Sequence, residues 1–181
     1  ILDEAFQATR TAMNIAEKKC ELEGQYQLGT EAALRPHLRT LIIIRQGKVW
    51  CTSLPGNRIL LKHIPVIADT NLQLTPASNT ENEIPVLLYQ TRFHTGRIIV
   101  TISGAHIRGA MNVPLAGVTY SLLVGDAALG LLGDVKTVTT SARASGQVNS
   151  AKYPFSIIYN KPPLFSAKRL VTQGSGILGF I

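Results

Sequence analysis

Two cysteines, Cys20 and Cys51, are the side chains of this 181-residue chain with the most distinctive chemistry. In a reducing compartment two thiols are usually small core residues, whereas in an oxidising one they are candidates for a disulfide. A third use is a thiol nucleophile paired with a remote histidine. The second cysteine makes pairing a simpler interpretation than catalysis, but the choice between core residues and a disulfide depends on their surroundings.

The histidines do not extend this pair into a metal site. They are scattered and show neither C-x-x-C nor H-x-x-x-H spacing, and two cysteines alone do not make a zinc site. The four are His37, His63, His94 and His106. We therefore predict no metal ligands.

Other catalytic patterns are missing as well. No serine stands in G-x-S-x-G, and the glycines of residues 125–133 lack the lysine and Ser/Thr ending of a phosphate-binding loop. Neighbouring carboxylates fit solvated faces or helix ends better than acid–base pairs. These are Asp3/Glu4, Glu21/Glu23 and Glu81/Glu83. We predict that the chain has no catalytic residues and needs no cofactor.

Composition places the chain among folded globular domains. Hydrophobic residues make up 45% and charged residues 16%, which excludes a disordered chain. No apolar run approaches the ~18 residues of a membrane-spanning helix, and Asp126 interrupts the most apolar stretch. The net charge of +7 is spread thinly, and the aromatic residues form no stacking ladder. This pattern favours a basic surface facing anionic envelope material over nucleic-acid binding.

The N-terminal 35 residues are predicted to be helical. Apolar residues recur at three- and four-residue steps, and we expect one continuous helix over residues 1–19 with a buried stripe of Leu2, Phe6 and Met13. Cys20 continues this stripe toward the core.

The second helical segment is predicted to be interrupted. Gly24 and Gly29 weaken it, so we expect a break before the helix resumes over residues 30–35. Pro36 then disfavours helical geometry at Arg35, and a stop is expected there.

Strands dominate the rest of the chain. Two hairpins are expected, over residues 38–45 and 49–52 with Gln46-Gly47 as the turn, and over residues 86–93 and 97–103. Further predicted elements are a turn at 55–57, a surface loop at 58–84, a helix at 105–111, strands at 117–124 and 135–144 with a glycine-rich link between them, and a strand at 154–159.

This order of elements predicts the fold class. Helices followed by five to seven strands indicate α+β, with N-terminal helices packed on an antiparallel β-sheet. We find no internal repeat and no linker, so residues 1–181 are expected to form a single domain. Helices before strands would also suit a PAS- or Cache-like extracytoplasmic sensor, which is an analogy of fold alone.

Three short runs carry a family resemblance. They read LDEA at residues 2–5, LRPHLRTL at residues 34–41 and VWCTSLPG at residues 49–56. Together they resemble the CSS-motif sensor domain, the periplasmic module placed before the EAL domain in bacterial cyclic-di-GMP phosphodiesterases. The match covers residues 1 to about 57. The defining Cys-Ser-Ser reads Cys51, Thr52 and Ser53 here, and the threonine keeps a hydroxyl.

The resemblance implies an arrangement in the membrane. The chain opens on Ile1 rather than Met, and we interpret it as a piece of a longer protein. The resemblance implies a module on the periplasmic side of the bacterial inner membrane, between two transmembrane helices. Residue 1 would follow the first helix and residues 176–181 would approach the second.

The resemblance also implies a mechanism. Cys20 and Cys51 would form a redox-sensitive disulfide whose reduction releases activity in the cytoplasmic enzyme, and we expect reduction to loosen the first helix more than the sheet. Expected partners are periplasmic thiol–disulfide oxidoreductases, the parent's own transmembrane helices and EAL domain, and a second copy of the chain. The chain itself is expected to have no phosphodiesterase activity. The alternative is a ligand-binding sensor module with a purely structural disulfide.

Overall fold

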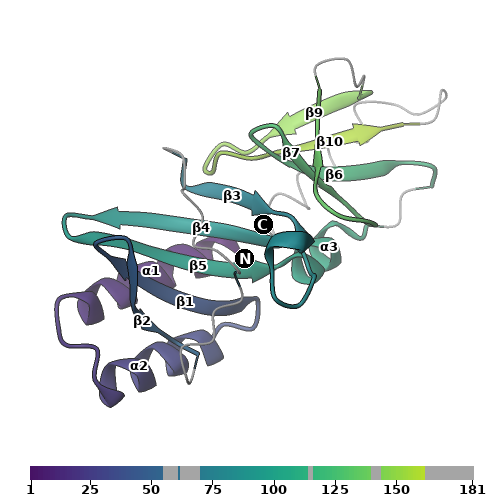
Figure 1. Ribbon diagram of the computed structural model, residues 1–181. Helices are drawn as coiled ribbons and strands as arrows, with labels where there is room; N and C mark the ends of the chain where they lie inside the picture. Colours follow the sequence, from purple (N-terminus) through teal and green to yellow (C-terminus); the bar gives the residue numbers. More distant parts are fainter. Residues whose placement is uncertain (55–60, 62–69, 114–115, 140–143, 162–181) are drawn as a thin grey trace.

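The computed structural model in Figure 1 describes residues 1–54, 61, 70–113, 116–139 and 144–161. Within these residues the chain is α+β, with three α-helices and two antiparallel sheets. The N-terminal helices pack on the first sheet, as the order of elements predicts.

The first sheet contains both predicted hairpins, and its strand order is β2-β1-β5-β4-β3. At the tip of the first hairpin, Gln46 and Gly47 have φ of 51° and 72°. Two successive positive φ values are typical of the tight turn whose twist suits a hairpin. The strands are β1 (Leu38–Arg45), β2 (Lys48–Thr52), β3 (Leu72–Thr75), β4 (Val86–Phe93) and β5 (Gly96–Ser103).

Both faces of this sheet are buried at its centre. Leu41 and Ile43 of β1 belong to the large core under the helices, whereas Ile42 and Ile44 belong to a smaller cluster with Leu61 on the opposite face. This double burial explains why residues 41–44 are continuously apolar rather than alternating.

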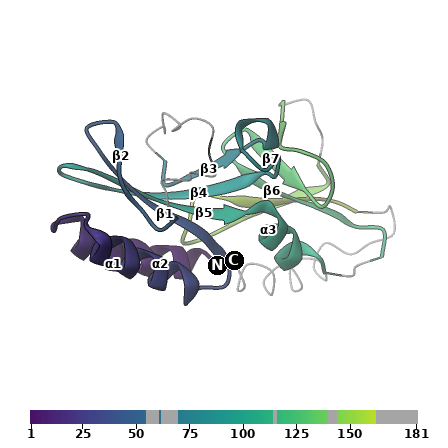
Figure 2. The same cartoon turned by 60° about the horizontal axis from the view of Figure 1, so that its bottom comes forward.

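Helices α1 (Leu2–Ala16) and α2 (Leu22–Ala33) lie side by side on one face of the sheet (Figure 2). The first helix ends at Ala16 rather than at residue 19. The expected stripe is also partly wrong, because Phe6 is 37% exposed and Met13 is only partly buried. Small side chains let α1 approach the strands closely, and its buried positions are Leu2, Ala5, Ala8, Thr9, Ala12, Ile15 and Ala16.

Helix α2 is continuous, which corrects the predicted break. Gly24 lies where α2 passes the preceding turn, and a Cβ built there would be 3.2 Å from the Lys19 carbonyl oxygen. Close packing, rather than a kink, accounts for this glycine. The helix stops at Ala33 with Leu34 as its C-cap, just ahead of Pro36 as predicted.

The second sheet has the order β8-β7-β6-β10-β9 and follows the predicted helix, α3 (Gly104–Met111). Its outer strands are short, and β9 was not predicted. The strands are β6 (Thr119–Val124), β7 (Ala127–Gly130), β8 (Lys136–Thr137), β9 (Gly146–Asn149) and β10 (Ser156–Asn160).

Five other regions differ from the prediction or lie partly or wholly outside the described residues. β3 and a short 3-10 helix (Ala77–Asn79) lie inside the expected loop at 58–84, and β7 replaces the expected glycine-rich link. The predicted strand at 135–144 is represented by the two residues of β8, and residues 140–143 lie outside the described residues. The turn at 55–57 and the closing segment at 176–181 also lie outside them.

Candidate functional site

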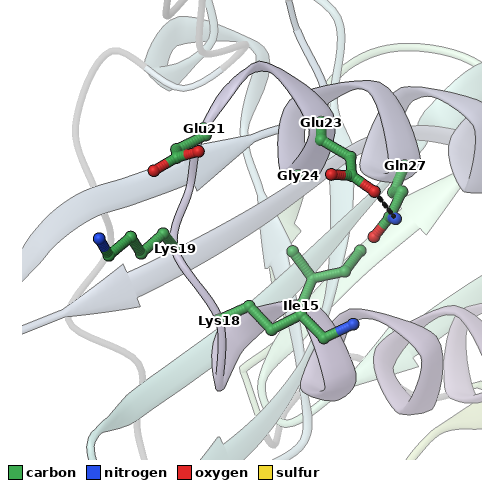
Figure 3. A pocket seen from close by; sticks show the side chains of 7 residues that line it. All are labelled: Ile15, Lys18, Lys19, Glu21, Glu23, Gly24 and Gln27. Atoms are coloured by element: carbon green, nitrogen blue, oxygen red, sulfur yellow. Dashed lines mark hydrogen bonds between the residues drawn. The ribbon is translucent and has the colours of Figure 1, made fainter.

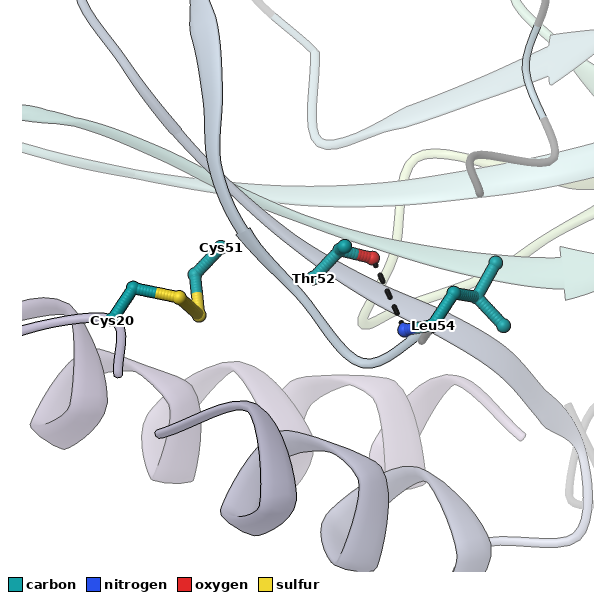
Figure 4. The surroundings of a disulfide bond; sticks show 4 residues. All are labelled: Cys20, Cys51, Thr52 and Leu54. Atoms are coloured by element: carbon teal, nitrogen blue, oxygen red, sulfur yellow. Dashed lines mark hydrogen bonds between the residues drawn. A yellow bond between two sulfur atoms is a disulfide. The ribbon is translucent and has the colours of Figure 1, made fainter. Parts of the chain in front are cut away.

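The structure joins Cys20 to Cys51 by a disulfide (Figure 4). Cys20 lies in the turn between α1 and α2, and Cys51 lies in β2, the edge strand of the first sheet. The two Cα atoms are 5.6 Å apart and the two Sγ atoms 2.08 Å. Of the uses that the sequence left open, the disulfide is therefore the one adopted, and no cysteine remains as a nucleophile in this state.

A β-bulge directs Cys51 toward the helices. Cys51 is the cross-strand partner of Ile43 and Val49 is that of Ile44, so Trp50 is the extra residue of β2. The Arg45 guanidinium stacks over the Trp50 ring at 4.0 Å from its centroid, a favourable cation–π contact that holds the bulge. Cys51 thereby joins the core beneath α1 and α2.

The two cysteines differ in exposure. Cys51 is 2% exposed, whereas Cys20 is half-buried. A cavity of about 320 Å³ opens beside Cys20 and is lined by both of its neighbours, Lys19 and Glu21 (Figure 3). Of the two cysteines, Cys20 is thus the one closer to solvent.

The two residues after Cys51 shape the end of β2. The Ser53 amide donates to the Leu41 carbonyl at 2.9 Å, and the Ser53 hydroxyl accepts from the Leu41 amide at 2.9 Å. The Thr52 hydroxyl accepts from the amide of Leu54 at 3.3 Å (Figure 4). Such i→i+2 bonds need only a hydroxyl, which Ser and Thr both supply. This explains why threonine can stand at the second position of the motif.

Helix α2 is attached to the sheet at few points. Its buried residues are Gly24 and Leu28, while Leu22 and Tyr26 are 84% and 74% exposed. A groove of about 540 Å³ runs between α2 and the end of β2, where Thr52, Ser53 and Leu54 line one side. The disulfide lies at the N-terminal end of this loosely packed helix.

Helix α1 is held at its other end by polar contacts. The Nδ1 nitrogen of His37 donates to both carboxylate oxygens of Glu4, at 2.9 and 3.0 Å. The ring of His106 from α3 packs edge-to-face on His37, with 5.7 Å between ring centroids, and its Nδ1 donates to the His37 carbonyl at 3.0 Å. Sequence reasoning missed this cluster because its members are far apart in the chain.

The preceding residue of α1, Asp3, contacts the second sheet. Asp3 accepts hydrogen bonds from the Lys152 ammonium and the Tyr153 hydroxyl in the turn between β9 and β10. These two donors hold the pKa of Asp3 below its ordinary value. Burial, together with the Asp3 carboxylate, raises the pKa of Tyr153. Asp3 and Glu4, adjacent in sequence, therefore bind different partners and form no acid–base pair.

The described residues contain neither a metal-binding cluster nor a membrane-spanning helix. Within residues 1–54, 61, 70–113, 116–139 and 144–161, no three His, Cys, Asp or Glu side chains are placed to hold a metal ion. Over the same residues no helix has the length and apolar content needed to cross a membrane.

Comparisons with known proteins extend the resemblance beyond the cysteines. A family model described as "CSS motif domain associated with EAL" matches residues 1–173. The chain is also similar to the probable cyclic di-GMP phosphodiesterase PdeG of Escherichia coli (strain K12), with 61% identity over 181 residues. That alignment covers 100% of this chain and 36% of the relative, so the chain spans about a third of that protein.

Proposed function

This chain belongs to the family of CSS-motif domains associated with EAL, and on that premise we propose that it is the periplasmic redox-sensing domain of a membrane-bound cyclic-di-GMP phosphodiesterase. The observation that carries the proposal is the disulfide between Cys20 and Cys51. It crosslinks the turn between two helices to the sheet below them. Reduction therefore changes how the helices are held but leaves the hydrogen bonds between the strands intact.

The proposed switch is ordinary thiol–disulfide exchange. An incoming thiolate attacks Sγ of Cys20, the more accessible sulfur, and Cys51 leaves as a thiolate. A second external thiol then resolves the mixed disulfide, which leaves two protein thiols and one oxidised reductant. Periplasmic thiol–disulfide oxidoreductases are the class of partner that supplies or removes these electrons.

In this proposal helix α1 transmits the signal from the disulfide to the membrane. In this proposal α1 follows a transmembrane helix of the parent protein, which leads through the membrane toward the EAL domain. α1 continues directly into the turn that carries Cys20, so a change at the disulfide reaches it through a few residues of backbone. The domain acts by positioning this helix and is not itself catalytic.

One observation favours a second candidate function. The groove beside α2 is lined by the motif residues Thr52 and Ser53 and by the exposed side chains of Leu22 and Tyr26. A small envelope ligand in this groove would make the domain a ligand-binding sensor in which the disulfide is a structural crosslink.

The test uses the full-length parent protein in membranes. Cyclic-di-GMP hydrolysis is measured for wild type after oxidation and after reduction, and for Cys20→Ser and Cys51→Ser. We expect both variants to match the reduced wild type, with higher turnover, and to ignore added reductant. Equal turnover in all four samples would reject the switch, and the ligand-binding alternative would then be the better account.

A further inference from the structure

The end of β2 contains an unusual hydrogen bond. In a regular antiparallel pair the Leu41 amide would donate to the backbone carbonyl of its partner, Ser53. Here the Ser53 hydroxyl accepts that bond instead, while the Ser53 amide still donates to the Leu41 carbonyl. The side chain completes the rung, and the backbone is free to bend away at Ser53 and Leu54.

This rung lies two residues from Cys51, on the side opposite to the bulge. Cys51 therefore lies between two contacts with the neighbouring strand, at the bulged Trp50 before it and at the Ser53–Leu41 hydrogen bonds after it. Both contacts are with β1, an inner strand of the sheet, and Leu41 is fully buried. Cys20, in contrast, lies in a half-buried turn and has no strand to hold it.

We propose that Ser53 is a positioning residue for the redox pair: its hydroxyl keeps Cys51 in place beside α2 in both redox states and so sets the stability of the disulfide. The inference rests on the proposed redox role of Cys20 and Cys51. A fixed Cys51 keeps the two thiols at high effective concentration after reduction, which favours re-formation of the bond.

Removing the hydroxyl affects the two redox states unequally. In the oxidised protein the disulfide holds β2 in place, so Ser53→Ala leaves the buried Leu41 amide without an acceptor. In the reduced Ser53→Ala variant, neither the disulfide nor the hydroxyl holds the end of β2, which can move away, expose that amide to water and separate the thiols. The variant therefore favours the dithiol.

In the experiment this chain is equilibrated with reduced and oxidised glutathione. In the exchange reaction, one protein disulfide and two glutathione thiols give two protein thiols and one glutathione disulfide. Alkylation and mass spectrometry give the equilibrium constant. We expect Ser53→Ala to shift it about tenfold toward the dithiol, equivalent to about 30 mV. Ser53→Thr, which keeps a hydroxyl, should remain within about twofold of wild type.

A matched control separates positioning from general destabilisation. Ile99→Val trims the core on the opposite face of the sheet and should lower the unfolding midpoint without moving the redox equilibrium. If Ser53→Ala loses stability but keeps the wild-type equilibrium, or if Ser53→Thr shifts as much as Ser53→Ala, the proposal is overturned.

A second measurement needs no variant and stands even if Ser53→Ala does not fold. Hydrogen exchange of the Leu41 amide is followed in the oxidised and reduced wild-type chain. The proposal requires this amide to stay protected on reduction, and exchange as fast as that of α2 would contradict it. Neither readout involves phosphodiesterase activity, so failure here leaves the redox function standing, and failure of the activity test leaves these results unchanged.

Discussion

The two helices that cover the first sheet are held in opposite ways. α1 crosses the middle of the sheet over β1, β4 and β5, buries residues along its whole length and is bonded at its first turn through Asp3 and Glu4. α2 lies at the edge over β1 and β2 and buries only Gly24 and Leu28. The attachment of α1 is thus spread along the helix, whereas α2 relies mainly on buried Leu28, partly buried Ala32 and the disulfide just before its first turn.

The magnitudes show which attachment of α2 dominates. Burial of one leucine side chain contributes roughly 1.5–3 kcal/mol. A crosslink that closes a loop of about 32 residues contributes roughly 3.5–4 kcal/mol in the chain-entropy model. We therefore expect reduction to release α2 and the Cys20 turn first, and to reach α1 through that turn.

The largest effect is expected for Cys51→Ser. Loss of the crosslink should lower the free energy of unfolding by about 3.5 kcal/mol, measured by urea denaturation under oxidising conditions. Cys20→Ser should give the same loss, and added reductant should bring wild type to the same midpoint while leaving both variants unchanged. A loss below about 1 kcal/mol would show that the crosslink contributes little to holding α2.

The next effect is expected at the apolar anchor of α2. Leu28→Ala should cost about 2–4 kcal/mol, because the side chain is fully buried between α2 and the sheet. Leu22→Ala in the same helix is the control, and this 84% exposed residue should change stability by less than about 0.5 kcal/mol. Similar losses of stability for the two variants would contradict this packing, because they would mean that the Leu22 side chain is buried in solution.

Two glycines of α2 should respond differently to alanine. A Cβ at Gly29 would lie 3.6 Å from the Ser53 carbonyl oxygen, an ordinary contact, so Gly29→Ala should stabilise the helix by about 0.5–1 kcal/mol. A Cβ at Gly24 would lie 3.2 Å from the Lys19 carbonyl oxygen, and the crowding should cancel that gain. Thermal unfolding of the two variants checks the difference, and a gain at Gly24 as large as at Gly29 would contradict this packing.

The smallest effect is expected at the first turn of α1. The pKa of Asp3 is lower in the folded than in the unfolded chain, so its contribution is present above the unfolded pKa and is lost as the pH falls through the folded one. Because Asp3 is exposed, Asp3→Asn should cost less than about 0.5 kcal/mol at neutral pH. The difference in the free energy of unfolding between Asp3→Asn and wild type, measured by urea denaturation as a function of pH, should vanish in acid. A difference that grows as the pH falls would contradict the prediction.

Much of the fold could be predicted from local patterns. The two hairpins of the first sheet were predicted because Gln46-Gly47 and His94-Thr95-Gly96 separate strongly apolar runs. The predicted break in α2 was wrong because helix propensity counts Gly24 and Gly29 against a helix, whereas α2 accommodates both, and close packing at Gly24 uses its missing side chain. β7 and β9 were missed because short, half-exposed strands have weak patterns and depend on neighbours distant in sequence.

The candidate site was only partly predictable. The family resemblance pointed to Cys20 and Cys51, and the structure pairs them. The sequence associated the bond with the first helix, whereas the packing leads us to expect that α2 depends on it more; which helix responds to reduction stays a prediction. The role of Ser53 could not be derived, because whether a serine hydroxyl meets a particular backbone amide is decided by how β2 bends away from β1.

The most direct test of this account is hydrogen exchange of the whole chain before and after reduction, resolved by segment. We predict that the amides of α2 and the Cys20 turn lose most of their protection on reduction, those of α1 a smaller part, and those of β1, β4 and β5 almost none. Uniform loss over the sheet and both helices would show that the disulfide stabilises the whole domain. Unchanged protection in α2 would show that the bond does not control the helix, and the proposed switch would be rejected.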